Sequence, residues 1–229
     1  MDLQILPDAD SVAAEAARLI ARQCREAVAA RGRFSLAVSG GHTPWVMLGA
    51  LAQEDVPWRQ VYVAQVDERV APPGHQDRNL THLRESLLAH VALPLENICA
   101  MAVDSLDLMA AARQYALRLR EIAGAPPELD LVHLGLGPDG HTASLVPGDH
   151  VLEITDDDVA LTQPYQGRRR MTLTFPALNR ARRILWVVTG AEKAGMLLRL
   201  RNGDVGIPAG CVRRDKALIL ADRSAAESL

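Results

Sequence analysis

The stretch LDLVHLGLGPDGHTASLVPGD, from Leu129 to Asp149, constrains this chain more than any other. Its first part, Leu129 to Leu136, is an apolar run typical of a buried parallel strand. Three glycines and a proline between residues 135 and 140 then force a sharp turn, where an acid and a base, Asp139 and His141, lie. Because ligands of open α/β sheets bind beyond the carboxyl ends of strands, we expect this pair to be functional.

Strand-like and helix-like segments alternate along the chain from Phe34 onward. This alternation predicts an α/β fold of doubly wound type, with a mainly parallel sheet and helices on both faces. We expect one domain over residues 1–229, and the pattern leaves the strand order open. The expected strands cover residues 34–39, 61–67, 97–103, 129–136, 171–175, 183–190 and 216–222. The expected helices cover residues 12–30, 45–53, 80–91, 105–124 and 191–203, and residues 176–181 are expected to form a short helix or a turn.

Helix boundaries can be predicted from capping residues. Asp10 or Ser11 is expected to cap the first helix, which Gly32 ends. Thr43 is expected to cap the second helix, with Pro44 at its first position.

Composition excludes several classes of function. The net charge of −3 and the pI of about 6.2 argue against a broad nucleic-acid surface, which needs a basic patch. No apolar run is long enough to span a bilayer, and the N-terminus lacks the pattern of a signal peptide. The three cysteines have no C-x-x-C spacing, which favours reduced thiols without a metal site. We therefore expect a cytoplasmic protein without membrane or nucleic-acid partners, and a monomer, since no exposed apolar helix face stands out.

The strongest candidate for catalysis is His141. A histidine changes protonation near neutral pH and suits a general base, and Asp139 could orient it or hold its charge. The alternative is a hydrogen-bonded turn histidine, which we rank second. The G-x-G-x-x-G spacing here resembles a dinucleotide fingerprint, but Pro147 and Gly148 leave no room for the helix that a pyrophosphate needs.

Other polar segments follow predicted strands. Residues 39–43, SGGHT, could bind phosphate through backbone N–H groups, and an ordinary tight turn is about equally favoured. For Asp67-Glu68-Arg69 a solvated loop is favoured on spacing alone. Arg168-Arg169-Arg170 and Lys193 could each hold an anion, and a solvated face is again the safer interpretation.

Several segments together resemble one family, the 6-phosphogluconolactonases. They match in order and spacing from about residue 11 to residue 225. The segments are Ser39-Gly-Gly-His-Thr-Pro44, Val66-Asp-Glu-Arg69, Leu134-Gly-Leu-Gly-Pro-Asp-Gly-His-Thr-Ala-Ser-Leu145, Met171-Thr-Leu-Thr-Phe-Pro-Ala-Leu-Asn179 and Val188-Thr-Gly-Ala-Glu-Lys193. The loop around His141 together with the D-E-R strand end is specific, whereas the glycine turn alone is not.

The resemblance implies hydrolysis of a sugar-phosphate lactone, 6-phospho-D-glucono-1,5-lactone, in the oxidative pentose phosphate pathway, with no metal or organic cofactor. His141 would activate water, with Asp139 and Arg69 flanking the reacting end. The residues that would bind the substrate and its phosphate are Gly40, Gly41, Thr43, Asp67, Asn79, Arg170 and Lys193. Arg69 or a backbone N–H of the glycine turns could stabilise the oxyanion.

The sequence leaves two alternative functions open. A glucosamine-6-phosphate isomerase/deaminase would have a similar D-G-H loop, but it typically has D-E-Y instead of D-E-R and a carboxylate soon after the histidine. Residues 142–147, TASLVP, contain none. A non-catalytic sugar-phosphate sensor would be expected to have lost the base, and His141 is present.

Overall fold

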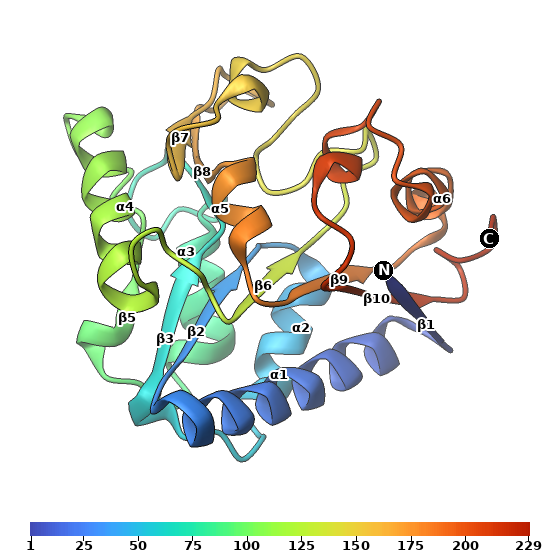
Figure 1. Cartoon of the computed structure of the whole chain (residues 1–229), viewed down its shortest axis with the longest axis horizontal. Helices are drawn as coiled ribbons and strands as arrows, with labels where there is room; N and C mark the ends of the chain where they lie inside the picture. Colours follow the sequence, from blue (N-terminus) through green and yellow to red (C-terminus); the bar gives the residue numbers. More distant parts are fainter.

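Seven parallel strands form the central sheet of the computed structural model, which describes residues 1–229 (Figure 1). Their order in the sheet is β1-β10-β9-β6-β2-β3-β5. The strands are β1 (Asp2–Leu6), β2 (Phe34–Val38), β3 (Val61–Gln65), β5 (Ile98–Cys99), β6 (Leu131–Leu134), β9 (Ile184–Val188) and β10 (Ala217–Asp222). The predicted doubly wound α/β class is confirmed, although the sequence pattern did not predict the edge strand β1.

The strand order reverses between β2 and β6. From β2 the chain proceeds to β3 and β5 on one side, whereas from β6 it proceeds to β9 and β10 on the other. Such a reversal leaves a crevice at the carboxyl ends of the two central strands. The glycine turn after β2 and the loop that contains His141 after β6 therefore lie at the same point of the sheet edge.

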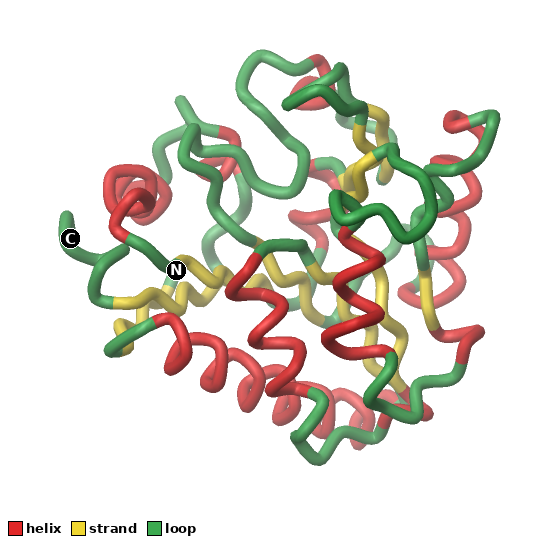
Figure 2. The backbone as a smooth tube through the Cα atoms, turned by 180° about the vertical axis from the view of Figure 1, so that it is seen from behind, coloured by secondary structure: helices red, strands yellow, loops and turns green.

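Helices cover both faces of this sheet. Seen from behind in Figure 2, α1 (Ala9–Arg31), α2 (His42–Leu51) and α3 (Asn79–Leu83) lie on one face, where α3 continues into the π-helical segment η2 (Arg84–Leu88). On the other face lie α4 (Leu108–Ala123), α5 (Phe175–Arg180) and α6 (Ala194–Asn202). One buried apolar cluster fills the space on each side. None of these helices is both long enough and apolar enough to cross a membrane.

The predicted caps differ from the observed ones. The first helix is capped by Asp8, whose carboxylate accepts the Ser11 N–H at 2.8 Å, and it ends at Gly32 as expected. The second helix begins two residues before Pro44, after Gly41, and no side chain caps it. The Thr43 hydroxyl instead lies 2.7 Å from the hydroxyl of Thr189. The prediction of a Thr43 cap was wrong because this side chain binds a neighbouring strand end rather than its own helix.

A second, antiparallel sheet was not predicted, although a strand at residues 171–175 was expected and overlaps one of its members. It consists of β4 (Asp67–Arg69), β8 (Arg170–Leu173) and β7 (Val159–Leu161), in the order β4-β8-β7. Its register places Arg69 directly opposite Arg170. Residues of β7 and β8 belong to the apolar cluster that lies between the main sheet and helices α4, α5 and α6. The small sheet therefore holds two distant arginines side by side at the carboxyl edge of the main sheet.

A buried histidine connects the two central strands. His133 of β6 has no exposed surface, and burial lowers the pKa of its ring to about 3. Its Nδ1 accepts the Ser39 N–H at 3.3 Å, and its carbonyl accepts the Ser39 hydroxyl at 3.0 Å. The neutral ring thus helps to hold the start of the glycine turn against β6.

This histidine makes the stability of the protein depend on pH. Its pKa is about 3 in the folded protein and about 6.5 when exposed, so the unfolded state binds more protons between these values. The free energy of unfolding therefore decreases as the pH falls below 6.5. His133→Asn keeps an oxygen acceptor near the position of Nδ1 but cannot titrate. Urea unfolding at pH 7 and pH 5 should show that the wild type loses about 2 kcal/mol more than the variant. Equal losses in the two proteins would contradict this account of His133.

Candidate active site

A polar pocket of about 320 Å³ opens at the carboxyl edge of the sheet, where the strand order reverses. Nine of the ten site residues expected from the sequence line it: Gly40, Gly41, Thr43, Asp67, Arg69, Asn79, His141, Arg170 and Lys193. The tenth, Asp139, lies beside His141 and binds its ring. Segments spread over 154 positions of the chain, from Gly40 to Lys193, are thus brought to one cavity.

His141 and Asp139 form a directly hydrogen-bonded pair. Nδ1 of His141 lies 2.5 Å from Oδ1 of Asp139, and the same oxygen accepts the His141 backbone N–H at 3.1 Å. The other oxygen, Oδ2, accepts the hydroxyl of Tyr165 at 3.0 Å. Partial burial alone would raise the pKa of Asp139, but these hydrogen bonds outweigh it and hold the pKa below its usual range. The carboxylate therefore stays ionised and orients the ring, which leaves Nε2 for the pocket.

Close packing explains one glycine of this loop. A Cβ on Gly137 would lie 2.1 Å from Nδ1 of His141, so any larger residue would displace the ring. The Gly137 N–H also donates to the His141 carbonyl at 2.8 Å, which closes the loop on itself. The glycine-rich sequence is thus needed to fold the histidine back over its own turn.

The glycine turn after β2 touches a third segment in the same way. A Cβ on Gly40 would lie 2.0 Å from Oδ1 of Asn79. The Asn79 amide Nδ2 donates to the carbonyl of Asp67 at 2.9 Å. Gly40 therefore lets the asparagine approach closely enough to join the turn to the start of β4.

Asp67 is buried rather than solvated. Its side chain is only 4 % exposed, and Oδ2 accepts the hydroxyl of Ser144 at 2.6 Å. The Ser144 hydroxyl is in turn 3.5 Å from Nη1 of Arg170. The interpretation of residues 67–69 as a solvated loop was wrong, because hydrogen-bond donors from other segments surround these carboxylates.

Two arginines approach the pocket from the small sheet. Arg170 is 4 % exposed, which corrects its interpretation as part of a solvated face. Burial and the nearby charge of Arg69 lower the pKa of Arg170. The buried Nε atoms of both arginines have no hydrogen-bond partner within the protein. Two like charges with unused donors beside a cavity favour an anionic ligand.

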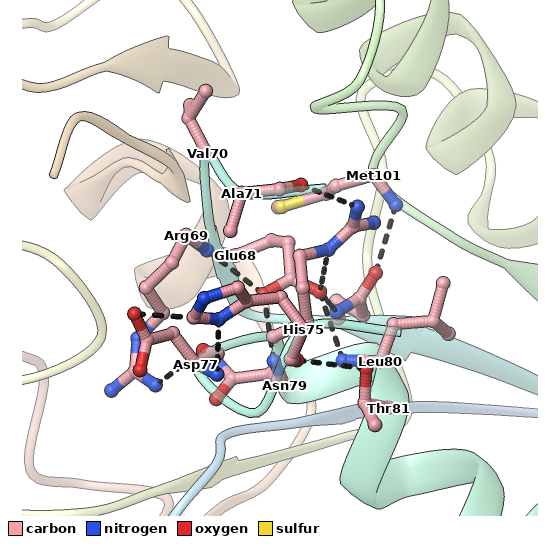
Figure 3. Close-up of polar contacts among 12 residues, drawn as sticks. Glu68, Arg69, Val70, Ala71, His75, Asp77, Asn79, Leu80, Thr81 and Met101 are labelled. Atoms are coloured by element: carbon pink, nitrogen blue, oxygen red, sulfur yellow. Dashed lines mark hydrogen bonds and ion pairs between the residues drawn. The ribbon is translucent and has the colours of Figure 1, made fainter. Parts of the chain in front are cut away.

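Glu68 holds the loop that carries two of these site residues (Figure 3). Its carboxylate is fully buried and accepts hydrogen bonds on both oxygens. The hydrogen-bond donors are Gln65 Nε2 and the backbone N–H groups of Arg69, Asn79 and Leu80, at 2.7 to 2.9 Å. Nε of Arg78 lies 3.2 Å away as the ionic partner. A single buried charge therefore fixes the backbone of both Arg69 and Asn79.

The remaining wall follows β9. Lys193 lies at the end of a short 3₁₀ helix, Ala191–Lys193, and lines the pocket together with Glu192. The preceding Gly190 N–H is held by the carboxylate of Asp222, at 3.1 and 3.2 Å from its two oxygens. Lys193 is thus a third cation at the cavity, presented by a segment that the end of β10 anchors.

The family model for glucosamine-6-phosphate isomerases/6-phosphogluconolactonase matches residues 7–220 of this sequence. The chain belongs to this family. It is 35% identical to the 6-phosphogluconolactonase of Mycobacterium tuberculosis over 241 aligned residues, which cover 99% of this chain and 98% of the relative. It is 34% identical to the 6-phosphogluconolactonase of Nostoc sp. over 202 residues, which cover 86% and 84% of the two chains.

Solved structures of the family share the fold. The crystal structure of 6-phosphogluconolactonase from Thermotoga maritima superposes with a TM-score of 0.86 at 26% identity, and covers 96% of this chain and 98% of its own. A monomeric glucosamine-6-phosphate deaminase superposes with a TM-score of 0.88 at 17% identity, with complete coverage of both chains. Since both kinds of enzyme have this fold, the choice between their reactions depends on the residues of the site.

Proposed function

We propose that this chain hydrolyses 6-phospho-D-glucono-1,5-lactone to 6-phospho-D-gluconate in the pentose phosphate pathway. The observation that carries the proposal is the Asp139–His141 pair, which faces a pocket lined by Arg69, Arg170 and Lys193. This arrangement provides a base for water at one place and cations for a phosphorylated sugar around it. The relatives that match nearly the whole chain at about 35% identity carry the same activity in their names.

In the proposed reaction, Nε2 of His141 takes a proton from water as the water oxygen attacks the lactone carbonyl. Asp139 holds the ring and stabilises the imidazolium that forms. The tetrahedral intermediate then collapses, the bond to the ring oxygen breaks, and the imidazolium returns the proton to that oxygen. The products are the open-chain alcohol and a carboxylic acid, which ionises.

Two groups are available for the oxyanion, namely Arg69 and a backbone N–H of the glycine turns. The start of α2 has free backbone donors because no side chain caps this helix. We assign Gly40, Gly41 and Thr43 to the sugar phosphate on this ground, together with Arg170 and Lys193. Asp67 and Asn79 complete the substrate-binding wall. This anchoring supplies orientation rather than chemistry.

The deaminase alternative is supported only by the shared fold and by a family model that includes both kinds of enzyme. It requires a carboxylate soon after the histidine for ring opening, and residues 142–147 contain none. Ser144 of this segment is committed to a hydrogen bond with Asp67.

To test the proposal, glucose 6-phosphate dehydrogenase generates 6-phospho-D-glucono-1,5-lactone in the assay mixture. Product is followed through 6-phosphogluconate dehydrogenase, and spontaneous hydrolysis is subtracted. We expect the protein to accelerate hydrolysis of this lactone much more than that of glucono-1,5-lactone, which has the same ester but no phosphate for the cations to bind. No acceleration by a folded sample would overturn the proposal, and ammonia release from glucosamine 6-phosphate would then assign the deaminase reaction.

A further inference from the structure

Tyr165 contacts all three parts of the proposed machinery although it does not line the pocket. Its hydroxyl donates to Oδ2 of Asp139 at 3.0 Å. Its ring meets the His141 ring edge-on, with centroids 5.6 Å apart and planes at 68°. The guanidinium of Arg170 lies over the Tyr165 ring, 4.9 Å from the centroid. The Tyr165 side chain thus contacts the proposed base His141, the carboxylate of Asp139 and the buried guanidinium of Arg170.

The backbone holds Tyr165 in this position through a tight hairpin turn. Tyr165 and Arg168 exchange backbone hydrogen bonds at 2.9 and 3.3 Å. The two residues between them, Gln166 and Gly167, have positive φ angles of 50° and 79°. This is the pattern of a type I′ turn, which costs strain at the non-glycine Gln166. The Gln166 side-chain oxygen accepts a hydrogen bond from Nη2 of Arg170 at 3.2 Å, so the strained turn also contacts this cation.

The contact with Asp139 needs a protonated tyrosine. Partial burial and the hydrogen bond to the Asp139 carboxylate both raise the pKa of Tyr165. The hydroxyl is therefore a donor at neutral pH, and Asp139 receives a donor on each oxygen. Without Tyr165, the Asp139 carboxylate would be fixed only from the His141 side and could rotate about its last bond.

We propose that Tyr165 is a positioning residue for the hydrolysis. Its hydroxyl orients the Asp139–His141 pair, and its ring supports the guanidinium of Arg170. The inference rests on the proposed function. The two parts of the Tyr165 side chain have different roles, because the hydroxyl acts on the base and the ring acts on the substrate-binding cation.

Two substitutions test these roles separately. Tyr165→Phe removes the hydroxyl and keeps the ring, so kcat should fall roughly tenfold with KM little changed. Tyr165→Leu removes both, so kcat should fall and KM for the phosphorylated lactone should rise as well. The matched control is Tyr62→Phe, which removes the same atom from β3 outside the pocket and should leave both constants unchanged.

A second measurement does not depend on turnover. The proton between His141 and Asp139 should give a low-field NMR resonance, assigned by its loss in His141→Asn. This resonance should shift or exchange away in Tyr165→Phe and persist in Tyr62→Phe. An unchanged resonance in folded Tyr165→Phe would overturn the inference, with or without a lower kcat, because the hydroxyl would then not act on the pair. Inactive wild type with a resonance that responds to Tyr165→Phe would instead reject the proposed function alone.

Discussion

His141→Asn is expected to lower kcat for lactone hydrolysis by roughly 10²–10⁴-fold, the contribution of a positioned general base. Asparagine places polar atoms near the position of Nδ1, so the contact with Asp139 can be kept while Nε2 is lost. The cations of the pocket are untouched, so KM and the affinity for 6-phosphogluconate should change little. Steady-state kinetics with the coupled assay and calorimetric binding of the product measure the two effects.

The matched control for this variant is His90→Asn. His90 is exposed, bonds only the carbonyl of Glu85 and does not line the pocket. It should retain wild-type kcat and product affinity. A nearly normal kcat in His141→Asn together with weak product binding would show that His141 holds the substrate instead of activating water.

Two loops of the site, at residues 40–41 and 139–141, were predictable because each is determined by a short continuous segment of the sequence. Glycines beside Asp139 and His141 favour a sharp turn, and a turn after a buried strand lies at the carboxyl edge of a parallel sheet. The structure places the pair there, at hydrogen-bond distance. The glycine turn at Gly40 and Gly41 follows from the same reasoning, and both residues line the pocket.

The non-local part was not predictable from single segments. Strands β4 and β7 have only three residues each, too few for an alternating pattern to be recognised, so nothing in the sequence signals that Arg69 pairs with Arg170. Charge alone suggested solvation for Glu68 and Arg170, but their burial depends on donors and acceptors contributed by other loops. Tyr165 had no motif around it, and its role follows only from its three contacts.

Glu68→Ala is expected to lower the free energy of unfolding by about 3–5 kcal/mol, because it leaves the buried Arg78 charge uncompensated. The backbone N–H groups of Arg69 and Asn79 would also lose their acceptor. Since both residues line the pocket, kcat/KM should fall on the order of 10²-fold even where the variant is folded. Urea unfolding and the coupled assay give the two values. The control Glu85→Ala removes a carboxylate that is 68% exposed and should cost less than about 0.5 kcal/mol.

A double variant distinguishes the effect of the buried charge on stability from the effect of Glu68 on the loop that it holds. Glu68→Met with Arg78→Met removes both charges, so no unpaired ion remains and part of the lost stability should return. The backbone donors of residues 69, 79 and 80 still lack their acceptor, so kcat/KM should stay low. Recovery of stability without recovery of activity would identify Glu68 as the residue that positions Arg69 and Asn79. If the double variant regained wild-type kcat/KM, the loop would hold its shape without the carboxylate, and Glu68 would serve only to neutralise Arg78.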